Sequence, residues 1–532
     1  MILRRTLVAL LCLSMFALDA AGAARAGGTL RRPSTPELGT LDPQKTPGIP
    51  ERMIDLDLFE GLTTYAADGR VVPGAATAWE ESADGRRWTF HLRHDAKWSN
   101  GDPLTAEDFV YTLRRLVDPA TASPNAFAVA AIMNAREIEA GTERDATRLG
   151  VSAPDPHTLV VDLANRSTLL PAQLASVAFP VNRKAIEAHG DQWTRPGNIV
   201  TNGPFVLTEW TPHVRAVLRR NPLFHSADEV RLDEVDWIVT EDNATALKRY
   251  RSGELDIATP PLTDLDFARR NFPGELHQGR ELMVEYLAFN LRAEPFRSNL
   301  KLRQALALAI DREALNTRVV DPAGQVSTLS YVPPLGTDYQ PQTPAYAEIP
   351  EPDRLATARR LMTEAGYPPG RPLKLTAIYS TNRLVKKRLL SIASMWKQAL
   401  GVELAIDNRE WQNWLSALRD GNFQISWCLE ASDLVDASDF LSAYRSTAGE
   451  MNNAGYRNPE YDKLVDAAGA ESDPERRTSL LETAERLLLT DTPLIPLDNP
   501  ESYVLVSRHV TGWRDSIIWA HPSRYLGIAT AN

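Results

Sequence analysis

Segments with the two-residue period of strands alternate with segments with the helical period in both halves of the chain. WTFHLR (88–93) alternates apolar and polar residues, as a half-buried strand does. After the turn SNGD, Thr105 predicts the start of a helix, and Asp108 three residues later completes a capping box. Further strands are predicted at 158–163 and 214–220. This alternation favours an α/β fold over an all-α or all-β one.

Longer helices are predicted in the second half. The stretch 301–315 repeats apolar residues at helical spacing and is predicted to form one helix. Three further helices are predicted to end at Gly366, Gly401 and Gly421, because glycine is the common residue just past a helix. A final amphipathic helix over 473–489 precedes TPLIPL, which reads as a strand broken by its prolines.

The length of the chain exceeds what one hydrophobic core organises. A chain of 532 residues is expected to form more than one domain, each of roughly 100–200 residues. The sequence contains no internal repeat and no low-complexity tract. Two separate α/β regions would leave a cleft between them, which is the usual place for a ligand.

The first residues have the order of a secretory signal peptide. Arg4 and Arg5 precede an apolar stretch, and small residues end at Ala26, so residues 1–26 are predicted to be cleaved off. The apolar stretch is shorter than the about 20 residues of a membrane helix, and no later segment is apolar enough to cross a bilayer. The mature protein is therefore expected to be exported and soluble.

Charge and cysteine content narrow the class of protein. The chain has a formal net charge of −11, and the predicted signal peptide carries more basic than acidic residues. Nucleic acid and anionic membranes would be repelled by the mature protein. With the signal peptide removed, Cys428 is the one cysteine left, so no internal disulfide forms and a buried structural thiol is expected.

Catalytic motifs are absent from the sequence. It contains no serine nucleophile elbow, no P-loop, no GxGxxG and no HExxH. No histidine lies near Cys428 in sequence, which argues against a thiol nucleophile. His91 and His94 lie three apart on a strand and face opposite sides, so they do not form a joint metal site. The sequence therefore predicts no enzyme activity, no metal and no cofactor.

The stretch ISWCLEASDLVDASDF (425–440) combines an apolar strand with four acids. The spacing differs from that of a calcium loop, whereas a pair of catalytic carboxylates stays open. For Asp433, Asp436 and Asp439 the plain interpretation is a solvated loop and helix start. Glu430 directly follows the apolar run, and a carboxylate there needs a cationic partner, either an internal arginine or the ammonium of a ligand.

Over nearly its whole mature length the chain resembles the periplasmic oligopeptide-binding proteins that serve bacterial ABC importers. The resemblance rests on many stretches in the same order. These stretches are LDPQKTPGIPE (41–51), DLFEGL (57–62), WTFHLRHDAKWSNGDPLTAEDFVY (88–111), DPATASP (118–124), RPGNIVTNGPFVL (195–207), RYRSGELD (249–256), FNLRAEPF (289–296), LRQALALAIDR (302–312), YVPP (331–334), AGYPPGRPL (365–373), EW (410–411) and WC (427–428).

The resemblance implies a two-lobed fold with a discontinuous lobe I, an inserted extra domain and a hinge. Lobe I would combine residues 27–59, 184–282 and 498–532. The inserted domain would span 60–183, and lobe II would span 283–497. Two strand crossovers would form the hinge, and ligand binding would shift the lobes toward a closed state.

The resemblance also implies a mode of binding. In the family an extended peptide pairs with backbone groups of both lobes. Here the backbones near Ile49 and at Ser426–Cys428 match those segments. The α-ammonium of the ligand meets an aspartate just after a Trp-Cys pair, a position that reads Glu430 here, with Asp433 as the substitute if the alignment is shifted. Trp411 and Trp427 would supply apolar walls, unless they pack in the core.

Several positions depart from the family pattern. A pocket tyrosine, a pocket glutamate and a histidine that meets peptide carboxylates read Ala128, Ala288 and Val385. The arginine that precedes the family's Trp-Cys pair has no counterpart. Arg383 or Arg419 would replace the lost cations.

The family's disulfide partner of the cysteine in the Trp-Cys pair reads Met283 here. By the resemblance, Met283 would stand beside Cys428. A methionine there supports the interpretation of Cys428 as an unpaired thiol.

Three functions follow as hypotheses. The first is a monomeric periplasmic receptor that captures oligopeptides and delivers them to a membrane ABC permease, without nucleic acid, cofactor or chemistry of its own. The second keeps the receptor role for a different ligand, such as a cell-wall (murein) peptide or an opine-like amine, because the carboxylate-reading positions are altered. The third is an enzyme or a folding helper that uses the same cleft.

Overall fold

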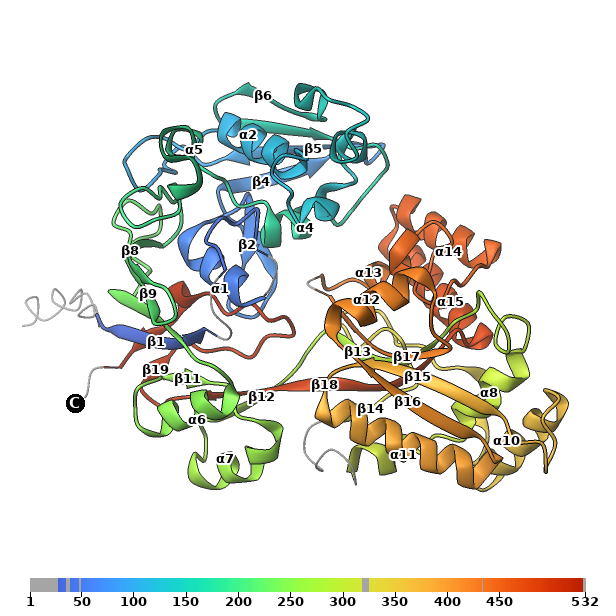
Figure 1. The fold of residues 1–532 in the computed structure, drawn as a ribbon. Helices are drawn as coiled ribbons and strands as arrows, with labels where there is room; N and C mark the ends of the chain where they lie inside the picture. The colour runs from blue at the N-terminus through green and yellow to red at the C-terminus, as the bar shows by residue number, and fades with distance from the viewer. Residues whose placement is uncertain (1–26, 35–38, 47–48, 318–324, 433, 530–532) are drawn as a thin grey trace, which may run out of the picture.

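The structure is a computed structural model that describes residues 27–34, 39–46, 49–317, 325–432 and 434–529. Two lobes lie on either side of a few crossing segments, and a further domain sits on the first lobe (Figure 1). Strands and helices alternate throughout, as predicted.

Lobe I is built on a four-stranded sheet that joins distant parts of the chain. Its order is β1 (Thr29–Ser34), β10 (Glu234–Val239), β9 (Arg215–Arg220) and β8 (Phe205–Thr211). β1 runs parallel to β10, so this N-terminal strand is held by residues about two hundred positions later. Its other elements are α1 (Ile49–Leu58), α5 (Arg183–His189), α6 (Asn243–Arg251), β11 (Ile257–Ala258), α7 (Leu265–Asn271), β12 (Leu276–Arg280), β19 (Val510–Thr511) and β20 (Gly527–Ile528).

The domain above lobe I has its own sheet and its own core. Its main helix, α2 (Ala106–Val117), starts as predicted: the Thr105 backbone N–H donates to Asp108 Oδ2 at 2.8 Å in a capping box. The apolar face of α2 packs on the sheet, whose order is β4-β5-β7-β6. Its other elements are β2 (Thr63–Tyr65), β3 (Val71–Pro73), β4 (Ala76–Glu81), β5 (Arg87–Leu92), α3 (Ala135–Glu139), β6 (Val151–Asp155), β7 (Thr158–Asp162) and α4 (Leu170–Val177).

Lobe II is built on a mixed sheet. β17 (Ile425–Ala431) lies between β13 (Met283–Phe289), which is antiparallel to it, and β15 (Lys374–Ser380), which is parallel to it. β16 (Glu403–Arg409) closes that side of the sheet, and β18 (Leu494–Val506) pairs with the other side of β13. The other elements are α8 (Leu300–Leu308), α9 (Arg312–Leu315), β14 (Gln325–Ser327), α10 (Glu351–Glu364), α11 (Arg383–Leu400), α12 (Trp411–Asp420), α13 (Ala437–Ser442), α14 (Pro459–Ala470) and α15 (Pro474–Asp491).

The strand β18 joins the two lobes. Its first half pairs with β13 in lobe II, and its second half pairs with β12 and β11 in lobe I, so it crosses between the lobes as one long strand (Figure 1). The prediction of a strand broken by proline is therefore wrong. A register shift in β13 between Glu285 and Tyr286 lies opposite Pro496, which lets the ladder continue past a residue without an N–H.

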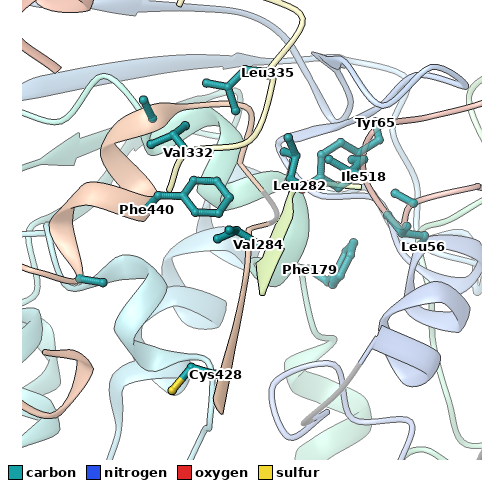
Figure 2. Packing of buried hydrophobic residues seen from close by; sticks show 14 of the residues in the cluster. Leu56, Tyr65, Phe179, Leu282, Val284, Val332, Leu335, Cys428, Phe440 and Ile518 are labelled. Carbon is teal, nitrogen blue, oxygen red and sulfur yellow. The ribbon is translucent and has the colours of Figure 1, made fainter. Parts of the chain in front are cut away.

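The chain also crosses between β12 and β13. The Leu282 N–H donates to Ile517 O in lobe I at 3.1 Å, and Leu282 O accepts from the Ser432 N–H in lobe II at 2.9 Å. Figure 2 shows Leu282 and Val284 between labelled core residues of the two lobes, and one buried cluster contains all of them. The two crossings thus form an apolar, hydrogen-bonded connection.

One predicted helix is two. The stretch 301–315 forms α8 and α9, with an interruption at Ala309–Asp311. Asp311 causes the restart, because its Oδ1 accepts from the Ala314 N–H at 2.9 Å as the N-cap of α9.

Among the described residues, no helix combines the length and the apolar character of a membrane span. The same part of the chain holds no group of three or more His, Cys, Asp or Glu side chains arranged to bind a metal ion.

Candidate ligand-binding site

The strand β17 has one open edge. β13 pairs with β17 along its whole length, from Met283 to Phe289. β15 pairs with the other edge only at Ile425 and Ser426. Within the described ranges, no strand pairs with that edge from Trp427 to Ala431. Backbone groups on such an edge can pair with an added extended chain.

Alternate side chains of β17 enter two different cores. Ile425 and Trp427 belong to the core beneath α11, whereas Cys428 belongs to the core that continues toward lobe I. The Trp427 ring is 5% exposed and lies under Arg388, whose Cζ is 4.6 Å from the ring centroid. The prediction of Trp427 as a wall of the ligand site is therefore wrong for its side chain, which is packed in the core.

Cys428 is a free, buried thiol, as predicted. Burial, as the largest effect, raises the pKa of this thiol to about 12. A thiol with so high a pKa is protonated at neutral pH and unreactive.

The pairing of β13 with β17 corrects the sequence alignment. Met283 lies opposite Ala431, whereas Cys428 lies opposite Tyr286. The expected position of Met283 beside Cys428 is therefore wrong by three residues. If Met283 occupies the place of the family's disulfide partner, then Ala431 occupies the place of the family's cysteine. The family's Trp-Cys pair then corresponds to Glu430 and Ala431, and the aspartate two residues later corresponds to Asp433, which lies outside the described residues.

Glu430 is a half-buried carboxyl group with no cationic neighbour in the described part of the chain. It lies opposite Val284 and on the same face of β17 as Cys428. Neither a hydrogen bond nor an ion pair joins it to another described residue. Burial, and to a smaller extent the charge of Asp439, raise its pKa to about 7. The sequence allowed two cationic partners for this acid, an internal arginine or the ammonium of a ligand. In the described part of the chain, no arginine pairs with Glu430.

The other acids of this stretch have structural partners. Asp436 is the N-cap of α13, accepting from the Ser438 N–H at 2.8 Å, and it forms an ion pair with Arg477 at 2.8 Å. Asp439 Oδ2 accepts from the Ser432 hydroxyl at 2.6 Å. The helix start is confirmed, but these two acids are bonded within the protein rather than only solvated.

Trp411 is an exposed ring on α12 that is linked to β17 through Trp414. It is 52% exposed and stacks on Trp414, with ring centroids 5.0 Å apart. Trp414 Nε1 donates to the Ser426 hydroxyl at 3.0 Å, which holds the pair against β17. This arrangement leaves about half of the Trp411 residue exposed, and its role as an apolar wall of the ligand site stays a prediction.

The remaining predicted residues lie elsewhere. Ile49 begins α1, so the prediction of an extended segment there is wrong, and a helix cannot pair as a strand does. Arg383 begins α11 and Arg419 lies in the last turn of α12. Both arginines are exposed, and neither is bonded to another described residue.

A buried ion triad lies behind the site and was not predicted. Arg388 on α11 forms ion pairs with Glu285 on β13 and with Asp498 on β18. Arg388 and Asp498 are fully buried, and Asn316 Oδ1 accepts from Arg388 at 3.2 Å. The triad therefore ties β13 and β18 to α11.

A family model decides the identity of the chain. Residues 70–452 match the model of bacterial extracellular solute-binding proteins, family 5. This protein belongs to that family. The family 5 protein is 36% identical to the probable deoxycholate-binding periplasmic protein YgiS of Escherichia coli (strain K12), over 89% of this chain and 88% of that protein. It is 35% identical to the periplasmic oligopeptide-binding protein OppA of Salmonella typhimurium (strain LT2), over 91% of this chain and 89% of that protein.

A solved structure resembles the fold of this family 5 protein. The unliganded open form of the periplasmic murein tripeptide-binding protein MppA matches with a TM-score of 0.83 and 33% identity, over 94% of this chain and 97% of that one. These findings confirm the resemblance and the two-lobed fold class. The relatives are solute-binding proteins of the periplasm.

Proposed function

We propose that this protein is a periplasmic receptor that captures oligopeptides between its two lobes and delivers them to an ABC import permease. The observation that carries the proposal is the open edge of β17 from Trp427 to Ala431, in a family whose relatives include oligopeptide-binding proteins. A peptide is an extended chain that can complete such an edge.

Backbone pairing explains how one site takes many peptides. An added strand bonds through its N–H and C=O groups, which every peptide shares, while its side chains point away from the sheet plane. Trp411 offers a large exposed ring that packs against varied side chains. Arg383 or Arg419 would meet the ligand carboxylate once the lobes close.

We assign the amino end of the ligand to Asp433. The support is the pairing of Met283 with Ala431: if Met283 takes the place of the family's disulfide partner, Asp433 takes the place of the family's aspartate in the sequence. Glu430 was the other carboxylate considered for this role, but it lies inside the strand rather than beyond its end.

The two crossings would act as the hinge between closed and open states. Leu282 and β18 connect lobe II with lobe I through backbone bonds, which allows the lobes to rotate without losing their connection. On this basis the domain boundaries keep their proposed positions: lobe I over 27–59, 184–282 and 498–532, the inserted domain over 60–183, and lobe II over 283–497.

Export and delivery complete the proposal. Cleavage of residues 1–26 would release a monomer into the periplasm, and a closed, liganded monomer would dock on the permease. Binding without chemistry is the proposed activity.

A second ligand class is favoured by a specific observation. The matched open structure belongs to a murein tripeptide-binding protein. A cell-wall peptide has the same extended backbone with additional amine and carboxylate groups, so it would use the same strand edge.

Native mass spectrometry and calorimetry test the proposal. Protein purified from the periplasm should carry peptide masses, and after unfolding and refolding it should bind alanine peptides of three to five residues with measurable heat. Small-angle scattering should show a smaller radius of gyration on binding. A co-purified mass without peptide bonds, or no heat and no compaction with any peptide, contradicts the proposal. Cleaved products in excess of the protein would instead indicate an enzyme.

A further inference from the structure

Glu430 lies at a place where a ligand side chain, rather than the end of a ligand, would meet it. It is the sixth residue of the seven-residue strand β17. Its ladder with β13 is regular from Met283 to Phe289, so Glu430 projects from a face of the sheet, as Cys428 and Ser426 do. On the face of a sheet, a residue has as its neighbour the side chain directly across in the adjacent strand. A peptide added to the open edge would supply that neighbour.

Among the residues that the structure describes, none supplies the cation that a buried carboxylate such as Glu430 requires. Its neighbours on β13 are Val284 directly opposite and the buried Tyr286. The fully buried rings of Tyr331 and Tyr444 lie near enough for the charge of Glu430 to raise their pKa values. The charged group that acts on Glu430 is another acid, Asp439, on α13.

The protein therefore holds a desolvated acid whose charged form nothing in the described chain stabilises. A group in this state costs stability when it is ionised, and a fully enclosed acid is better replaced by an apolar residue. Glu430 is not fully enclosed, because it keeps part of its surface beside the open edge. A cation that arrived with a ligand would complete its pairing.

We propose that Glu430 is a specificity residue that selects peptides with a cationic side chain, such as lysine, at the position that pairs beside it. This inference deepens the proposed function and rests on it. This lysine ammonium is not the α-ammonium of the peptide. The α-ammonium lies at the end of the peptide strand, whereas a lysine side chain projects from the face of the sheet that the peptide joins.

Glu430 and Trp411 would read different side chains. Trp411 is anchored through Trp414 to Ser426, four residues before Glu430 and about 13 Å from it along the strand. One end of the edge thus offers an aromatic surface, and the other offers a negative charge.

Binding of a cationic side chain beside Glu430 should release a proton from its carboxyl group. Glu430 is largely protonated at pH 6, since its pKa is raised to about 7. When a lysine ammonium binds, the carboxyl group ionises, its proton leaves to the buffer, and an ion pair forms. The nearby titratable groups are Asp439, Cys428, Tyr286, Tyr331 and Tyr444, and the tyrosines and the thiol stay neutral at this pH because burial raises their pKa values.

The experiment compares lysine with norleucine, which has a similar length and no charge. Pentaalanine and five lysine variants of it, each matched by a norleucine variant, are titrated calorimetrically into the wild-type protein, Glu430→Gln and the control Glu403→Gln. Glu403 begins β16 at the far side of the same sheet and is exposed, so its substitution makes the same charge change away from the edge.

We expect lysine to bind at least about tenfold more tightly than norleucine at one position. Glu430→Gln should abolish that preference, and Glu403→Gln should keep it. At pH 6, in buffers of different ionisation enthalpy, the lysine peptide should release more protons than its norleucine match. This comparison needs only the wild-type protein, so it stands even if Glu430→Gln does not fold.

One result would overturn the role of Glu430, and another would overturn the proposed receptor function. Equal affinity and equal proton release for lysine and norleucine at all five positions overturn the role of Glu430, while the peptide receptor stands. No binding of any of the peptides overturns the proposed function itself.

Discussion

Replacing Arg388 with methionine should destabilise lobe II strongly. Methionine keeps much of the length and volume of the side chain but removes its charge. Glu285 and Asp498 would then face each other as buried acids without a cation. The ring of Trp427 would lose the guanidinium that lies 4.6 Å from its centroid.

The expected loss follows from burial. Removing one partner of a buried ion pair costs about 3–5 kcal/mol of the free energy of unfolding, because the remaining charge is uncompensated. The lost contact with Trp427 adds about 0.5–2 kcal/mol. Since two acids remain, the part of the loss that comes from the broken ion pairs should lie near the upper end of its range at pH 8.

The loss should shrink in acid. Burial raises the pKa of Glu285 even beside Arg388, and without the arginine its pKa should rise further. A carboxyl group whose folded pKa lies above its unfolded value destabilises the fold once the pH exceeds the unfolded pKa. Lowering the pH toward about 4.5 protonates this group in the folded state, so the variant should regain part of its stability there.

Denaturant unfolding followed by circular dichroism measures these changes. The control is Arg360→Met, which removes an exposed i,i+4 pair with Glu364 and should cost less than about 0.5 kcal/mol. Adding Glu285→Gln and Asp498→Asn to Arg388→Met should restore most of the loss at pH 8. A loss of less than about 1 kcal/mol for Arg388→Met, or a loss independent of pH, would refute the reasoning.

Three further predictions concern single residues. Trp411→Ala should weaken peptide binding by about 0.5–1.5 kcal/mol in calorimetry, because a ring that is 52% exposed is removed, and it should change the free energy of unfolding by less than about 1 kcal/mol; unchanged affinity would exclude this ring from the site. Cys428 should react with a thiol reagent at pH 8 only in denaturant, because burial raises its pKa to about 12; labelling of the native protein at the rate of the unfolded one would contradict this. Glu485→Gln should lower the free energy of unfolding by about 1.5–3 kcal/mol and speed hydrogen exchange over 330–342, because Glu485 accepts from the N–H groups of Tyr331, at 2.9 Å, and Val332, at 2.7 Å. Unchanged exchange over 330–342 would contradict this prediction.

Local signals in the sequence predicted local structure well. The capping box of Thr105 and Asp108 acts between residues three positions apart, so it could be recognised and is present. The helix over 301–315 was predicted as continuous because its apolar spacing is continuous, although Asp311 restarts it. An aspartate inside an apolar repeat is a weak signal, since it is tolerated on an exposed helix face.

Long-range pairing could not be predicted from the sequence. Glu285 and Arg388 are 103 positions apart, and no pattern in either segment indicates the other. The continuity of β18 through its prolines depends on a register shift in β13, which is a property of the partner strand. The open edge of β17 likewise exists because β15 pairs with it only at Ile425 and Ser426.

The three-residue correction at Met283 shows why strand pairing decides the site. The dipeptide Trp427-Cys428 matched a family motif by residue type, but Met283 pairs with Ala431. Three is an odd number, so the correction also reverses the face on which each side chain lies. Cys428 therefore points away from the face that a bond to the residue at 283 would need, and it enters the core. If Met283 takes the place of the family's disulfide partner, the same shift gives Glu430 the place of the family's tryptophan, and Glu430 lies inside the strand with its side chain on a face of the sheet. Under the proposed function, a charge at that place would change which peptides bind, while the open backbone edge of β17 would bind the peptide main chain as before.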